Sequence, residues 1–202
     1  MKLIFATHNL GKLKEMRALL DGLPYEVTGA QQAGVTDEVE EDGETLEQNA
    51  LKKAHAVVKQ TGEWAVADDT GLFIAALDGR PGIHSARWAG PTRDEQEIID
   101  FTLKQMRGIP VENRDAFFES VVALVSPLGE ELIFRGRVTG KILEVPCGKI
   151  RPHLPYDSIF LPDGSQMAFA EMSDEKKNSI SHRGNAFRQL KKYLTTNNLK
   201  TL

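Results

Sequence analysis

The sequence has almost no cysteine, no long apolar run and no excess of positive charge, and each absence excludes a class of protein. Cys147 is the single cysteine among 202 residues, which rules out an internal disulfide and fits a reducing cytoplasm. No stretch approaches the roughly 18 apolar residues that span a bilayer, and no signal-peptide core is recognisable, so we expect no membrane association. The net charge of −4 argues against nucleic-acid binding, which usually needs a basic face.

The rest of the composition is typical of a globular protein. Hydrophobic residues make up 41% of the chain and charged residues 27%. The length fits one domain over residues 1–202, and no repeat, low-complexity tract or linker divides it. Strand-like and helix-like segments are mixed without strict alternation. The sequence therefore predicts an α/β fold with a mixed β-sheet and flanking helices.

Hydrophobic spacing predicts where the individual elements lie. A continuous apolar run over residues 3–6 is typical of a strand that is covered on both faces. From Lys12 the spacing becomes helical, and Asn9 is the expected N-cap. Further helices are expected over residues 44–60, over 93–106 with Thr92 as cap, and from 183 onward; strands over 64–67, 117–125, 132–138 and 158–161; and a turn at 78–82.

The turn between the first strand and the first helix has features of an anion site. It is not a standard phosphate-binding loop, because Ala6 stands at the first glycine position and Leu13 at the hydroxyl position. A helix N-terminus nevertheless offers N–H groups and the positive end of a dipole, and Lys12 adds a charge. From this stretch alone, phosphate binding and an ordinary capped helix with a solvated lysine both stay open.

Two acidic groups favour the phosphate interpretation. Asp68 and Asp69 follow the strand-like run 64–67, and strand ends often line the functional edge of an α/β sheet. Carboxylates near a phosphate-binding turn suit Mg²⁺, which prefers oxygen ligands. The alternative is that acidic residues before a helix simply stabilise its positive end. The second group, before the helix at 44–60, consists of Glu38, Glu40, Glu41 and Asp42.

Cationic residues gather near the C-terminus, at the expected start of the final helix. Lys177 and Arg183 can only donate hydrogen bonds, so they suit phosphate oxygens or the keto oxygens of a base. A solvated face is the alternative. Asn49 and Lys53 are four residues apart and share a helix face; the pattern slightly favours solvent, but a ligand-facing orientation stays open. The C-terminal cluster consists of Lys176, Lys177, His182 and Arg183.

Together, these segments resemble one family, the non-standard purine nucleoside triphosphate pyrophosphatases that act on inosine and xanthosine triphosphates. The resemblance implies an elongated α/β fold, with a long mixed sheet and two lobes around a central cleft, in a protein that is usually a homodimer. It also implies Mg²⁺-dependent hydrolysis of ITP, dITP and XTP to the monophosphate and pyrophosphate. The segments, in order, are "ATHNLGK", "EEDGETLEQNALKKA", "ADDTGL", "LDGRPGIHSARWAG" and "SISHRG".

The resemblance also implies roles for individual residues. Asp69 is the implied catalytic base, and Glu40 and Asp69 are the implied metal ligands, with Glu41 and Asp68 as alternative ligands. The residues implied to hold the triphosphate are Thr7, His8, Asn9, Leu10, Gly11 and Lys12. The other residues implied to contact the substrate are Thr70, Leu154, Pro155, Tyr156, Asp157, Lys177, His182 and Arg183, of which the last three are implied to recognise the base.

One segment departs from the family pattern. Relatives carry Phe-Gly-Tyr-Asp-Pro before the late strand, whereas Leu154, Pro155 and Ser158 replace three of those residues here. An aromatic surface that stacks on a base contributes roughly 1–3 kcal/mol, and Pro155 also fixes its own φ and removes an N–H donor. A pyrophosphatase with altered base preference therefore stays open, as does a non-catalytic nucleotide-binding module, against which the retained carboxylates argue.

Overall fold

The computed structural model describes residues 2–7, 10–37, 39–90, 94–197 and 199. The chain forms two compact units, each with a hydrophobic core of its own. Three strands, β3 (Trp64–Ile74), β5 (Asp115–Val125) and β6 (Glu131–Ile142), begin in one unit and end in the other. Unit 1 comprises Met1–Asp69, Ser120–Gly136 and Arg183–Leu202, and unit 2 comprises Thr70–Glu119 and Arg137–His182.

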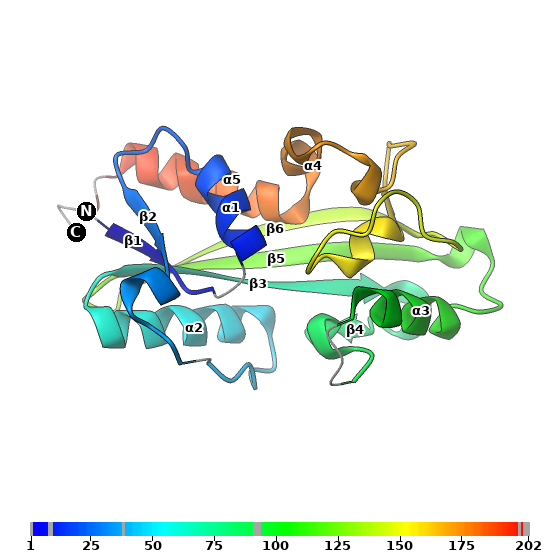
Figure 1. Cartoon of the computed structure of the whole chain (residues 1–202), viewed down its shortest axis with the longest axis horizontal. Coiled ribbons are helices and arrows are strands. Elements are labelled where there is room, and N and C mark those ends of the chain that lie inside the picture. Colours follow the sequence, from blue (N-terminus) through cyan, green and yellow to red (C-terminus); the bar gives the residue numbers. More distant parts are fainter. Residues whose placement is uncertain (1, 8–9, 38, 91–93, 198, 200–202) are drawn as a thin grey trace. The chain divides into compact units, whose positions relative to one another are not determined.

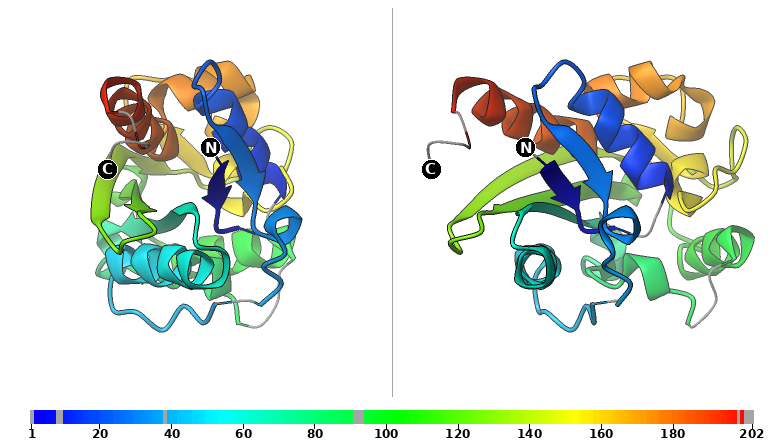
Figure 2. Two further views of the ribbon diagram at one scale, coloured as in Figure 1. Left: turned by 90° about the vertical axis from the view of Figure 1, so that its left-hand side faces the viewer. Right: turned by 60° about the vertical axis from the view of Figure 1, so that its left-hand side comes forward.

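Unit 1 is built on parallel strands with helices on both faces. β1 (Lys2–Phe5) pairs in parallel with β2 (Glu26–Gly29) on one side and with the beginning of β3 on the other. Helix α1 (Leu10–Leu19) and helix α5 (His182–Thr196) cover one face of these strands, and α2 (Leu46–Thr61) covers the opposite face (Figures 1 and 2). The candidate site residues of unit 1 come from these three helices, from β3, and from the segments that precede α1 and α2.

Local signals define α2 particularly well. The hydroxyl oxygen of Thr45 accepts a hydrogen bond from the backbone N–H of Gln48 at 3.1 Å, which caps the first turn. Gly62 ends the helix in a left-handed conformation that glycine adopts without strain. The buried positions Ala50, Ala54 and Val57 repeat at helical spacing, so one face of α2 packs against the sheet.

Unit 2 contains the other ends of the three shared strands. β4 (Pro81–Gly82) pairs antiparallel with β3, and β7 (Phe160–Pro162) pairs antiparallel with β6. Helices α3 (Glu95–Gln105) and α4 (Asp174–Ile180) complete the unit. Its core includes a group of aromatic rings, in which Phe118 packs edge-on against Phe160 with ring centroids 4.8 Å apart. Along the whole sheet the strand order is β2-β1-β3-β5-β6-β7.

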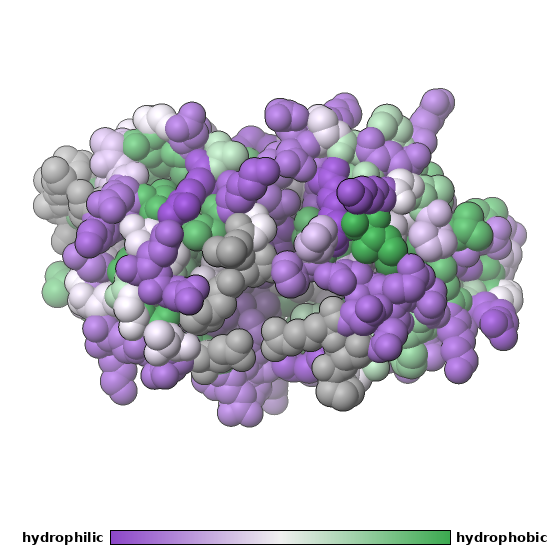
Figure 3. Space-filling view, in the orientation of Figure 1, coloured by the Kyte–Doolittle hydropathy of each residue, from purple (hydrophilic) through white to green (hydrophobic). Residues whose placement is uncertain are grey.

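The predicted fold class, a mixed β-sheet with flanking helices, is confirmed. β5 and β6 are neighbours joined by a tight turn in which the Ser126 N–H donates to the Glu130 carbonyl at 2.9 Å, so the predicted hairpin is also confirmed. Within the described ranges, no helix has both the length and the apolar composition needed to cross a membrane. The face in Figure 3 is mostly hydrophilic, with separate hydrophobic patches.

Three predicted boundaries were wrong. The strand that begins at Trp64 does not end before Asp68 but continues to Ile74, because its two carboxylates have cationic and amide partners inside the fold. The third helix is capped by Asp94, whose carboxylate accepts the Glu97 N–H at 2.9 Å; Thr92 lies outside the described residues. The late strand starts two residues later than predicted, since 155–158 form a short 3-10 helix with proline in its first turn.

Candidate functional site

Asp68 and Asp69 lie in the middle of β3, and both are buried. Their exposed fractions are 3% and 7%. Because successive side chains of a strand point to opposite faces of the sheet, the two carboxylates face different helices. Each must therefore find its own partners in order to stay ionised inside the protein.

Asp68 binds cations from α1 and α5. The Lys12 ammonium lies 3.3 Å from its Oδ1, and the Arg183 Nε donates to its Oδ2 at 3.2 Å. A second carboxylate, Glu15, accepts from Arg183 Nη1 at 2.8 Å. Burial opposes ionisation of Asp68, but the nearby positive charges outweigh it and hold the pKa of this carboxyl well below its usual range. Asp68 is therefore ionised at neutral pH and holds Lys12 and Arg183 in place.

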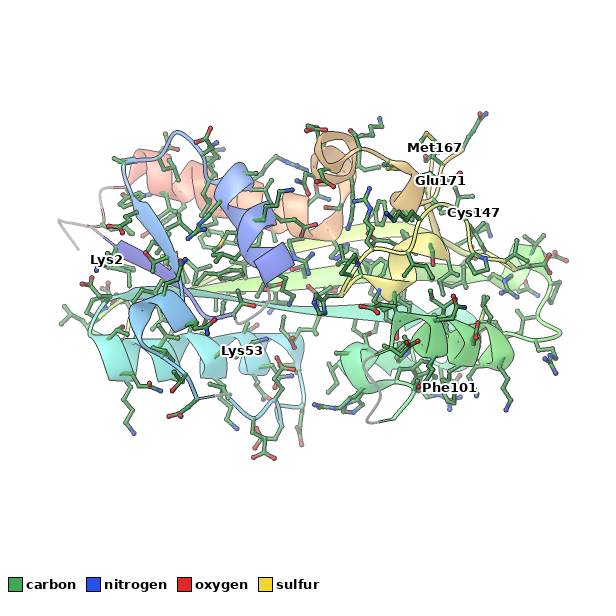
Figure 4. All side chains as sticks on the ribbon, viewed as in Figure 1. Lys2, Lys53, Phe101, Cys147, Met167 and Glu171 are labelled. Atoms are coloured by element: carbon green, nitrogen blue, oxygen red, sulfur yellow. The ribbon has the colours of Figure 1, made fainter. Side chains whose placement is uncertain are left out.

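Asp69 has a different environment, formed by α2. The Asn49 amide donates to Asp69 Oδ2 at 3.1 Å, and the Lys53 ammonium donates to Oδ1 at 3.2 Å. Burial is the largest influence and raises the pKa of Asp69, against the opposing charge of Lys53. Figure 4 labels Lys53 on α2. The sequence left open whether Asn49 and Lys53 face solvent or a ligand. In the structure, α2 turns both side chains toward the Asp69 carboxylate.

Lys53 also connects Asp69 to the acidic segment before α2. Its ammonium lies 2.7 Å from Glu41 Oε1, and burial alone would lower its pKa, but Asp69 and Glu41 together raise it. Glu40 is exposed, and Glu38 lies outside the described residues. Asp42 forms an exposed ion pair with Lys52 at 2.5 Å. Of the acidic residues in this segment, the structure brings Glu41 to Asp69.

The predicted phosphate-binding turn lies at the start of α1. Thr7 is half-buried, Gly11 is exposed on the first turn of the helix, and Lys12 reaches Asp68. Leu10 is the first helical residue. His8 and Asn9 lie outside the described residues, and so does the expected N-cap contact of Asn9. A helix N-terminus next to a lysine is suited to an anion.

Unit 2 holds a second buried polar group among the predicted substrate residues. The Lys177 ammonium lies 2.5 Å from Asp157 Oδ2, and both side chains are buried. The imidazole of His182 stacks on Phe118 with ring centroids 4.6 Å apart. A lysine ammonium can only donate hydrogen bonds, so this buried cation suits an acceptor. Arg183, although next in sequence to His182, belongs to unit 1 with Asp68.

The segment that departs from the family pattern is partly buried. Tyr156 is buried in the core of unit 2 and donates its hydroxyl to the Ser85 carbonyl at 2.7 Å, and burial raises the pKa of this phenol. Leu154 and Pro155 are half-buried. Thr70 is half-buried at the point in β3 where unit 2 begins.

Among the residues that the structure describes, no group of three or more histidine, cysteine, aspartate or glutamate side chains is arranged to hold a metal ion. Glu41 and Asp69 nevertheless share one cation, the ammonium of Lys53. Sequence analysis missed this relationship. Asn49 and Lys53 each precede a buried alanine of α2, Ala50 and Ala54. This spacing is the feature of the sequence that could have indicated that both side chains point into the protein.

The chain matches a known family over almost its full length. The model of the Ham1 family matches residues 3–193. The chain belongs to the Ham1 family. Similar Ham1 relatives include the dITP/XTP pyrophosphatase of Streptomyces coelicolor, which is 44% identical over 191 residues and 94% of each chain. The dITP/XTP pyrophosphatase of Bacillus subtilis is 41% identical over 95% of this chain and 96% of its own.

A solved Ham1 structure has the same fold. The HAM1 protein of Coxiella burnetii superposes with a TM-score of 0.89 at 38% identity, covering 98% of this chain and 100% of its own. The resemblance predicted from the sequence segments is therefore confirmed.

Proposed function

We propose that this protein hydrolyses the non-standard purine nucleoside triphosphates dITP, ITP and XTP to the monophosphate and pyrophosphate, which cleanses the nucleotide pool. The observation that carries the proposal is the pair of buried carboxylates in β3. Asp68 binds two cationic side chains, and Asp69 accepts hydrogen bonds from two side chains of α2. The relatives that carry the name dITP/XTP pyrophosphatase support this substrate class.

The triphosphate is assigned to the start of α1. Lys12 contributes positive charge, and the first N–H groups of the helix can donate to phosphate oxygens. The Asp68 carboxylate keeps Lys12 oriented. Such catalysis depends mainly on positioning and charge neutralisation.

Asp69 is assigned as the general base. A water oxygen forms a bond to the α-phosphorus while the bond from that phosphorus to the bridging oxygen of the β-phosphate breaks. The water proton passes to the Asp69 carboxylate, and pyrophosphate leaves with the electron pair of the broken bond. The raised pKa of Asp69 makes this carboxylate a better proton acceptor than an ordinary aspartate.

The residues around Asp69 fit a magnesium ion. Mg²⁺ is commonly held by one or two carboxylates together with substrate phosphates, and Glu41 and Asp69 already share a cation. When bound, Mg²⁺ neutralises charge on the phosphate oxygens. Glu41 is supported over Glu40 as the partner ligand, because Glu40 is exposed and Glu41 contacts Lys53.

Base recognition is assigned to residues of unit 2. Lys177 donates to Asp157, and as a group that only donates it is assigned to the keto oxygen at the purine 6-position. An amino group at that position would leave a buried donor unsatisfied, which is a strong basis for rejecting adenine. His182 is assigned to the same recognition, and Thr70 to a contact with the substrate. Arg183 is bound by Asp68 and Glu15, which supports a role near the phosphates.

An altered base preference is the second candidate function. The observation that favours it is the pair Leu154 and Pro155, which stand in place of phenylalanine and glycine. Tyr156, the remaining aromatic residue of the segment, is buried and its hydroxyl donates to Ser85, which leaves the half-buried Leu154 and Pro155 as apolar residues of the segment that a base could contact.

A homodimer and a cytoplasmic location complete the proposal. The family resemblance supports the dimer, and the single cysteine supports the location. Light scattering of the purified protein tests the assembly. The activity is tested by pyrophosphate release from ITP, XTP, dITP, GTP and ATP, with Mg²⁺ and with a chelator. We expect fast release from the first three and little from the last two; no release from any of them would support the non-catalytic module instead.

A further inference from the structure

We propose that Asn49 is a positioning residue that fixes the Asp69 carboxylate and ties the acidic segment 40–43 to it. The inference rests on the proposed function, because it takes Asp69 as the catalytic base. Asn49 itself is 1% exposed and is assigned no contact with substrate. Its two amide atoms instead join two parts of the site.

The orientation of the Asn49 amide is fixed by its contacts. The backbone N–H of Gly43 lies 2.8 Å from Asn49 Oδ1, and a backbone N–H can only donate. The oxygen of the amide must therefore face Gly43, which leaves Nδ2 to donate to Asp69 Oδ2 at 3.1 Å. The amide has no alternative orientation that satisfies both neighbours.

Asp69 is consequently held at both oxygens by one helix. Asn49 binds Oδ2 and Lys53 binds Oδ1, and these two residues are four apart on α2. Two donors at fixed spacing set the plane of the carboxylate as well as its position. A base must reach its proton at hydrogen-bond distance, so this plane determines which oxygen faces the reacting water.

Gly43 allows the acidic segment 40–43 to approach Asn49 closely enough for the hydrogen bond between them. A Cβ at this position would lie 2.6 Å from Asn49 Oδ1, closer than real Cβ contacts allow. The absence of a side chain lets the segment approach Asn49, and Glu41 is two residues earlier in the chain. The same amide thus places Glu41 beside Lys53 and Asp69.

The chain provides a matched control at the adjacent position. Gln48 Oε1 accepts the backbone N–H of Glu44 at 2.7 Å, so it also ties the segment before α2 to the helix. Gln48 is exposed and makes no hydrogen bond to Asp69 among the described contacts. Replacing Gln48 removes a contact of the same kind while leaving the carboxylate untouched.

The experiment compares Asn49→Asp, Asn49→Leu, Gly43→Ala, Gln48→Ala and Asp69→Asn. For each variant, kcat and KM for ITP are measured at saturating Mg²⁺, folding is checked by circular dichroism, and hydrogen exchange is measured at the Gly43 amide. Asn49→Asp keeps an acceptor for Gly43 but cannot donate to Asp69. Gly43→Ala disturbs Asn49 from the other side.

We expect both Asn49 variants and Gly43→Ala to lose about 10–100-fold in kcat with little change in KM, as is usual for residues that orient a catalytic group. Exchange at Gly43 should become faster in Asn49→Leu and stay slow in Asn49→Asp. Gln48→Ala should keep the kcat of the wild type.

The inference would be overturned by Asn49→Asp with the kcat of the wild type, or by Gln48→Ala with a loss as large as that of Asn49→Leu. If Asp69→Asn is inactive while Asn49→Asp is fully active, the positioning role fails and the proposed base stands. If Asp69→Asn is itself fully active, the proposed base fails, and the positioning role fails with it.

Discussion

Asp68 and Asp69 are neighbours in β3, but their carboxylates bind side chains from different helices and their pKa values shift in opposite directions. Asp68 accepts from Lys12 and Arg183, and its pKa lies below its usual range despite burial. Asp69 accepts from the α2 residues Asn49 and Lys53, and burial raises its pKa. One carboxylate is thereby suited to organising cations and the other to accepting a proton, and pairs of titratable groups with diverging pKa values mark acid–base sites.

Replacing Asp69 should stop the reaction without preventing binding. Asp69→Asn keeps the size of the side chain but removes the charge, and loss of a positioned base typically costs about 10²–10⁴-fold in rate. Steady-state kinetics with ITP gives kcat, and calorimetry gives the affinity of the inactive variant. A variant with more than about a tenth of the wild-type kcat, well outside that range, would contradict the assignment.

Replacing Asp68 should instead cost stability in a pH-dependent way. The folded protein holds the pKa of Asp68 below its unfolded value near 4, so Asp68 stabilises the fold above that pH and loses its contribution as the pH falls. Removing one member of a buried ion pair costs about 3–5 kcal/mol at neutral pH. Urea unfolding of the wild type and Asp68→Asn at pH 7 and pH 3 measures the difference, which should shrink at pH 3. An equal difference at both pH values would argue against the ion pairs as its source.

The two glutamates of the acidic segment should respond differently to substitution. Glu41→Gln removes the carboxylate that shares Lys53 with Asp69, so the Mg²⁺ concentration for half-maximal rate should rise about 10–100-fold. Glu40→Gln is the matched control, because Glu40 is exposed, and should behave as wild type. A Mg²⁺ titration of the rate with ITP compares them. The reverse order of effects would make Glu40 the ligand.

Restoring the family residues at 154 and 155 should strengthen base binding. The double change Leu154→Phe and Pro155→Gly adds a ring where Leu154 is half-buried, and Tyr156 cannot serve because it is buried and bonded to Ser85. If about 1.4 kcal/mol of stacking is recovered, KM for ITP falls about tenfold with kcat unchanged. The single change Pro155→Gly is the control for backbone effects. An unchanged KM, or a lower kcat, would show that the segment is not a base-stacking surface.

Elements defined by neighbouring residues were predictable from the sequence. Helix α2 was expected over 44–60 and runs from Leu46 to Thr61, because its cap and its apolar period are local features. The hairpin of β5 and β6 followed from the turn residues between them for the same reason.

The full length of β3 was not predictable, because its charges are accommodated by distant residues. A strand with two adjacent carboxylates at its centre is stable only if cations reach them, and Lys12 and Arg183 are 56 and 115 residues away from Asp68 in the sequence. The inward orientation of Asn49 and Lys53 depends in the same way on Asp69. The carboxylates and cationic residues of the sequence indicated a phosphate and metal site. Which cation or amide binds each carboxylate is determined by tertiary contacts, which the sequence does not show.

Attack of water on the α-phosphorus of a purine nucleoside triphosphate can be followed through the position of an oxygen isotope. The reaction with ITP is run in ¹⁸O-labelled water, and the products are examined by ³¹P NMR and mass spectrometry. We expect IMP and pyrophosphate in equal amounts, with the label in IMP and none in pyrophosphate. Label in pyrophosphate, or release of orthophosphate and IDP, would contradict it, because the bond broken would then be a different one.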